Sequence, residues 1–255
     1  MHAPGISFLV FALVVGGAFA GMVVRRARPD EHFNSEAKDT IRLAIGLVVT
    51  MTSLVLGMLV SSGKTYYDGQ KTEVAELSAE AMFINGLLTA YGTETQTQPL
   101  RVEARNFIQE LVDQIWPDDR SQPGKLKPLG NNQTFYQHLE LLTPTNPGQV
   151  AIKAELLTAT LTLRKSYWFM FLKSEQPAMS FSLLAVVTSW LVIIFFSFGL
   201  FAPRTPNVIL MLIVCALAVS AAIFIIVSLN SPFSGVMRIS PAAVRDVLDQ
   251  MALGQ

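Results

Sequence analysis

The stretch LAIGLVVTMTSLVLGMLVSSGKTYYDGQKTEVAELSAEAMFINGLLTAY (residues 43–91) decides the fold. Its first part, Leu43 to Ser62, contains no Asp, Glu, Lys, Arg or His, and about 20 such residues cross a hydrocarbon core as a helix. Its second part is amphipathic, because apolar residues recur every three or four positions, at Val74, Leu77, Ala81, Ile84, Leu88 and Tyr91. No proline interrupts Lys64 to Tyr91. We therefore expect a membrane span that continues, still helical, outside the membrane.

Three more charge-free runs of similar length occur, at Gly5–Val24, Met179–Ala202 and Val208–Leu229. Helices this apolar on every face are typical of membrane spans. The first run has a rival interpretation as a cleaved signal peptide, since Ala18–Ala20 resembles a cleavage site. However, no Lys or Arg precedes the run and the basic RRAR follows it, which argues against cleavage. The sequence predicts an all-α membrane protein with four transmembrane helices.

The spans divide the chain into four parts. Residues 1–62 hold the first two spans and a short basic loop, residues 63–178 an extramembrane helical domain, residues 179–230 the last two spans, and residues 231–255 a turn and an amphipathic helix. Within the extramembrane domain we expect helices over 100–116, 133–142 and 148–172. The apolar positions of the first of these are Val102, Phe107, Leu111 and Ile115.

Four spans place both termini and the middle domain on the same side of the membrane. The loop over residues 25–42 is basic, with Arg25, Arg26, Arg28, Lys38 and Arg42. Cytoplasmic loops carry an excess of such residues, so this loop is expected inside and the middle domain outside, in the periplasm. Other basic residues flank the opposite membrane ends: Lys64, Lys71, Lys173, Arg238 and Arg245.

The sequence offers little catalytic chemistry. His2, His32 and His138 are scattered, and Asp118 and Asp119 have no second acidic cluster to complete an acid–base or metal site. The formal net charge of zero gives no reason to expect nucleic acid as a partner. We therefore expect no enzyme activity, no cofactor and no metal, with the lipid bilayer as the main partner.

A stripe of small and hydroxylated residues follows one face of the second span, at Gly46, Thr50, Ser53, Gly57 and Ser61. Such a stripe allows close helix packing. Repeated around a homo-oligomer, it would instead line a narrow, weakly polar pore for a small inorganic ion. Both interpretations remain open. Gly17 and Gly21 in the first span have the spacing of a packing face. No span carries an ionisable residue, so any transport would be passive.

The tail SLNSPFSGVMRISPAAVRDVLDQM (residues 228–251) reads as a sharp stop followed by a new helix. Pro232 ends the fourth span, Gly235 allows a turn, and Ser240 with Pro241 suits a helix start. One helix face then collects Val244, Val247, Leu248 and Met251. We expect this face to dock on the middle domain or on a neighbouring subunit. The alternative is a helix lying on the membrane surface.

Several of these segments together resemble the bacterial bestrophin-like domain family. The resemblance rests on residues 53–95, with Lys64 and Asp68 after the second span, on DQIWP with Trp116 and Pro117, and on SPFSGVMRISP with Pro232, Phe233, Ser234 and Gly235. Members often have Leu-Asp-Arg where this chain has Ile84, Asn85 and Gly86. The resemblance implies kinship with bestrophins, which are oligomeric four-span anion channels with a cytoplasmic helical domain. It also implies a multi-pass protein of the bacterial inner membrane.

Two functions remain open from the sequence. The first is an oligomeric, bestrophin-like membrane protein that forms a passive anion channel. The second is a non-conducting scaffold or sensor, whose helical domain binds a partner.

Overall fold

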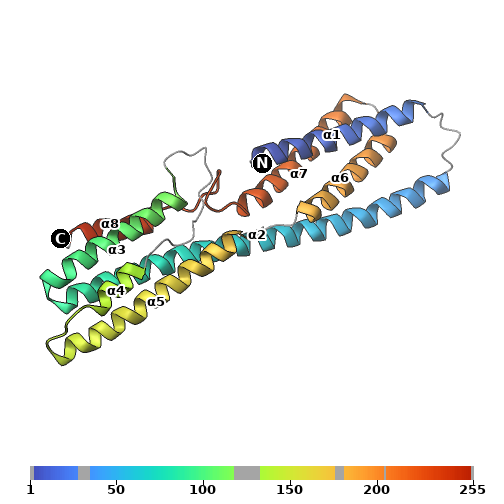
Figure 1. The fold of residues 1–255 in the computed structure, drawn as a ribbon. Helices are drawn as coiled ribbons and strands as arrows, with labels where there is room; N and C mark the ends of the chain where they lie inside the picture. Colours follow the sequence, from blue (N-terminus) through green and yellow to red (C-terminus); the bar gives the residue numbers. More distant parts are fainter. Residues whose placement is uncertain (1–2, 28–34, 118–132, 176–180, 204, 254–255) are drawn as a thin grey trace. The chain divides into compact units, whose positions relative to one another are not determined.

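The structure, a computed structural model, describes residues 3–27, 35–117, 133–175, 181–203 and 205–253. These residues form eight helices and, within the described ranges, no strand (Figure 1). Four helices are long and apolar enough to cross a membrane: Ala3–Arg26, Asp39–Tyr91, Phe181–Phe201 and Pro206–Leu229. The predicted all-α membrane fold is thus confirmed.

The chain forms two compact units, which are described separately. Unit 1 comprises Met1–Tyr66 and Ala178–Asn230, and unit 2 comprises Tyr67–Pro177 and Ser231–Gln255. The division falls within one helix, α2 (Ser35–Tyr91), which continues without a break as expected from its proline-free sequence.

Unit 1 is a helical bundle built by α1 (Ala3–Ala27), the first part of α2, α6 (Phe181–Phe201) and α7 (Pro206–Leu229). Its core is aliphatic, and α1 packs on both α6 and α7. The glycines of α1 explain the close approach to α6. A Cβ atom at Gly17 would lie 3.0 Å from the Val192 carbonyl oxygen, and one at Gly21 would overlap the Phe196 carbonyl. The predicted packing role of these two glycines is confirmed.

Two polar contacts close the ends of this bundle. Arg25, in the last turn of α1, donates from Nη1 to the Ala202 carbonyl oxygen at 2.6 Å, just past the end of α6. Carbonyl groups at a helix end lack partners within the helix, so the guanidinium satisfies one of them. At the end of α7, the Asn230 side-chain amide donates to the Ile226 carbonyl at 2.7 Å.

Unit 2 is formed by the remainder of α2 with α3 (Glu94–Ile115), α4 (Gln133–Glu140), α5 (Pro147–Glu175) and α8 (Ala242–Leu253). The predicted apolar face of α2 is buried at every position: Val74, Leu77, Ala81, Ile84, Leu88 and Tyr91. Gly92 turns the chain between α2 and α3 with φ +78°, a left-handed conformation that favours glycine.

Two details of α3 differ from the sequence-based expectation. The helix begins at Glu94 and contains Pro99, although we expected it to begin after this proline. The carbonyl of Thr93 accepts hydrogen bonds from the backbone N–H groups of Gln96 and Thr97, so the helix is already established before Pro99. Val102 is 41% exposed and does not belong to the core.

The tail helix packs within unit 2. Val244, Val247, Leu248 and Met251 are buried in the same core as α3. The side-chain hydroxyl of Ser240 accepts a hydrogen bond from the Ala242 N–H at 3.2 Å, as expected for a residue that caps the helix start. The prediction that the tail docks on the middle domain is confirmed.

Candidate functional site

The small-residue stripe of α2 is exposed along its full length in the monomer. Gly46, Thr50, Ser53, Gly57 and Ser61 are all exposed. A Cβ atom at either glycine would meet no described atom within 4 Å, in contrast to the tightly packed Gly17 and Gly21. Within this chain, therefore, the stripe is not a packing face.

A different face of α2 contacts the bundle of unit 1. Thr52 and Leu59 are buried, and Val48, Val55 and Leu56 are partly buried against the same core. Because successive residues turn by about 100° around a helix axis, the stripe lies roughly opposite this buried face. The structure thus brings the five predicted stripe residues onto one outward-facing side of the span.

Two hydroxyl groups of the stripe donate hydrogen bonds to the backbone of their own helix. Thr50 donates from Oγ1 to the Leu47 carbonyl at 2.7 Å, and Ser53 donates from Oγ to the Val49 carbonyl at 2.9 Å. Each hydroxyl has one proton to donate and two lone pairs to accept. The outward surface of the stripe therefore offers oxygen lone pairs, and no proton of these two hydroxyls.

The Trp-Pro and PFSG segments, distant in sequence, meet in unit 2. The indole Nε1 of Trp116 donates to the Ile239 carbonyl oxygen at 2.8 Å, and Phe233 stacks edge-on against the indole at a centroid distance of 6.1 Å. The Ile239 N–H donates in turn to the Pro232 carbonyl at 2.8 Å. Gly235 turns the intervening chain with φ +81°. These residues build the connection that leads into α8.

A cavity of about 570 Å³ lies beside this connection. Its lining includes the hydroxylated Ser234 and Ser240, and the cationic Arg238 and Arg245. Pro117 also borders it. The remaining two predicted motif residues, Lys64 and Asp68, are exposed and lie one turn apart on α2.

Of the scattered histidines and the paired aspartates singled out in the sequence, only His138 lies within the described residues. His138 is exposed, and its Nδ1 lies 3.0 Å from both carboxylate oxygens of Glu103. His2, His32, Asp118 and Asp119 lie outside the described residues. Across the described ranges, no group of three or more His, Cys, Asp or Glu side chains is placed to hold a metal ion.

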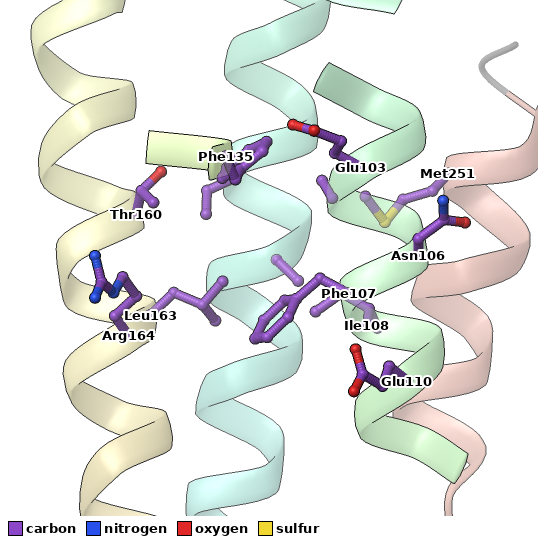
Figure 2. Close-up of a pocket in the computed structure, with 13 residues that line it drawn as sticks. Glu103, Asn106, Phe107, Ile108, Glu110, Phe135, Thr160, Leu163, Arg164 and Met251 are labelled. Carbon is purple, nitrogen blue, oxygen red and sulfur yellow. The ribbon is translucent and has the colours of Figure 1, made fainter. Parts of the chain in front are cut away.

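A second cavity of unit 2, drawn in Figure 2, contains residues that the sequence reasoning missed. One of them is Thr160, which is buried on α5. A signal for it was available. Leu156, Thr160, Leu163 and Tyr167 follow one another at spacings of four, three and four, so a threonine occupies a core position of this helix.

The comparisons agree with the arrangement of spans and motifs. The bestrophin-like domain matches residues 12–244, from the first span to the start of α8. The chain belongs to the bestrophin-like domain family. Neither the curated proteins nor the solved structures contain a match to the chain. For this bestrophin-like chain, membership of the family agrees with a four-span membrane protein.

Proposed function

We propose that this chain is an oligomeric membrane protein in which the stripe face of α2 is turned towards other copies, and that the assembly forms a passive channel for a small inorganic ion. The observation that carries the proposal is the position of the stripe. It lies roughly opposite the face through which α2 packs on its own bundle, and all five of its residues are exposed in the monomer.

The small share of the α2 span that is buried within the monomer supports an interface between copies. Only 11% of its apolar segment is buried in the monomer, compared with 44% for α1, 39% for α6 and 22% for α7. A lipid-facing helix needs no hydroxyls or glycines on its outer side, whereas contacts between membrane helices are enriched in both. The exposed stripe is therefore better suited to protein than to lipid.

The chemistry of the stripe bears on which ion would pass. As they stand, the Thr50 and Ser53 hydroxyls donate to helix carbonyls and offer lone pairs outward, which suits a cation. To bind an anion, each hydroxyl would have to turn its proton away from the helix. The hydroxyl orientation therefore favours a cation, whereas the support for an anion comes from the family relation. A flux measurement has to include both kinds of ion.

Reconstitution of the purified chain in liposomes tests this function. We expect measurable chloride or potassium flux, and we expect Ser53→Leu to reduce it by about tenfold or more by filling the narrow path. Ser189→Leu is the matched control. Ser189 is an exposed hydroxyl of α6 that donates to the Val186 carbonyl in the same way. Equal flux in the two variants would contradict a pore along the stripe.

The alternative function, a non-conducting scaffold or sensor, is favoured by the same hydrogen bonds. Because the Thr50 and Ser53 hydroxyl protons are used within the helix, the stripe can serve helix packing alone. An oligomer without ion flux would support this alternative. A chain that stays monomeric in lipid would overturn the channel.

For the orientation, we propose that unit 2 and both termini lie on the periplasmic side of the inner membrane. The support is the excess of basic residues at the opposite ends of the first two spans, including Arg25, Arg26 and Arg42.

A further inference from the structure

The cavity in Figure 2 lies within unit 2, with an apolar inner wall and a polar, solvent-facing rim. It measures about 230 Å³ and is lined by residues of α2, α3, α4, α5 and α8. Ile84, Ile108, Leu163 and Met251 form its deeply buried apolar wall. A cavity of about 150 Å³ with such a lining is large enough for benzene. This one has room for an aromatic ring with a short chain attached.

One polar group inside this cavity has no partner. Thr160 is 3% exposed, and its Oγ1 makes no hydrogen bond within the described residues. Its neighbours on α5 behave differently, because the exposed Thr158 and Thr162 each donate to the carbonyl four residues earlier, at 3.0 Å. Buried hydroxyls almost always have a partner. The free Thr160 hydroxyl is therefore placed to bind a polar atom of a molecule in the cavity.

The rim of the cavity is acidic. Glu103 and Glu110 contribute two carboxylates, the first of which also contacts His138 Nδ1 at 3.0 Å, and Arg164 contributes one guanidinium to the described lining. Two phenylalanines, Phe107 and Phe135, also line it, and aromatic faces attract cations. In Figure 2, Thr160 of α5 and Glu103 of α3 lie on either side of Phe135. A carboxylate ligand would meet this acidic rim, whereas an ammonium group would be attracted to it.

We propose that this cavity binds a small monoamine with a compact apolar body. The apolar part fills the space between α2, α3 and α5, and the ammonium group donates to Thr160 Oγ1 and towards the Glu103 carboxylate. No residue of the α2 stripe lines this cavity. Amine binding would therefore be a separate, regulatory or sensory function of unit 2.

Calorimetry on the full chain in lipid nanodiscs tests the proposal, with 2-phenylethylamine as the probe. The matched ligands are 2-phenylethanol and phenylacetate, which have the same body and a neutral or an acidic head. Empty nanodiscs correct for partitioning into lipid. We expect the amine to bind at least about tenfold more tightly than either matched ligand. Absence of amine binding, or binding of the alcohol or the acid with equal affinity, would overturn the proposal.

Two variants locate the binding. Thr160→Val keeps the shape of the side chain and removes its hydroxyl, so we expect it to weaken amine binding by about tenfold while the unliganded protein melts at the same or a higher temperature. Thr158→Val, on the exposed side of the same helix, should bind as the unmodified chain does. Glu103→Gln should weaken amine binding without affecting the alcohol. Unchanged amine affinity in Thr160→Val and Glu103→Gln would place the binding elsewhere and contradict the proposal.

Discussion

The indole N–H of Trp116 donates to the Ile239 carbonyl, and both groups are buried. Trp116→Phe retains an aromatic ring and leaves this carbonyl without its donor. We expect a loss of about 1–3 kcal/mol of stability, measured by thermal melting of the helical circular dichroism signal. Trp168→Phe is the control, because Trp168 is exposed on α5. Identical melting of the two variants would show that the Trp116 hydrogen bond does not stabilise the tail connection.

A substitution at Gly21 tests the contact between α1 and α6. A Cβ atom would overlap the Phe196 carbonyl oxygen, and a backbone atom cannot move aside cheaply. We expect Gly21→Ala to destabilise the protein by about 1–3 kcal/mol, seen as a lower temperature at which the detergent-solubilised protein aggregates. Gly16→Ala has open space around it and should be neutral or slightly stabilising. A Gly21→Ala protein as stable as Gly16→Ala would contradict the close packing.

Single residues were predictable from sequence where one pattern determined them. The roles of Gly17 and Gly21 followed from their spacing in an apolar run. Gln149 did not, although its amide Nε2 donates to the Tyr91 carbonyl at 2.9 Å and to Thr93 Oγ1 at 3.1 Å. A polar residue in a helix gives no indication of which distant carbonyl it will reach. The same holds for Thr160, whose position on the core face was readable but whose cavity was not.

At the scale of elements, the docking of α8 on α3 can be tested directly. Its apolar face is buried on α3 of the same chain. Val247→Asp places a charge in this core, so we expect α8 to detach and trypsin to cleave faster after the exposed Arg245. The control is Gln250→Asp, because Gln250 is exposed on the same helix. Equal cleavage rates in the two variants would contradict the docking of α8.

The helices were largely predictable because apolar periodicity and proline positions define them. The six predicted core positions of α2 are all buried. The prediction that Val102 belongs to the core face of α3 was wrong. The buried face of this helix contains Leu100, Ala104 and Ile108 instead. Val102 is two residues from Leu100 and from Ala104, which is about 200° around the helix, so it points to the opposite side. An isolated valine does not reveal which of two possible faces will be covered.

For the whole molecule, the membrane orientation is a proposal that labelling can test. In a Cys215→Ala background, a cysteine at the exposed Thr158 of unit 2 should react with a membrane-impermeant maleimide added to intact spheroplasts. A cysteine at Thr205, in the short connection between α6 and α7, should react only after the membrane is permeabilised. The reverse pattern would place unit 2 in the cytoplasm.

The number of spans and the existence of the stripe were readable from the sequence of one chain. The direction in which the stripe faces was not, because it depends on which side of α2 packs on the bundle of unit 1. In the structure, Thr52 and Leu59 are buried on the side of α2 that faces the bundle, and Ser53 is exposed on the other side. The proposal that copies meet through the stripe rests on that one relation.

Disulfide cross-linking in native membranes tests this claim most directly. In the Cys215→Ala background, Ser53→Cys places a single thiol on the stripe, and Ser189→Cys places one on an exposed face of α6. If copies meet through the stripe, mild oxidation should convert most of the Ser53→Cys chain to a covalent dimer and little of the Ser189→Cys chain. If Ser53→Cys stays monomeric, or cross-links no better than Ser189→Cys, the stripe does not face another copy and the account is contradicted.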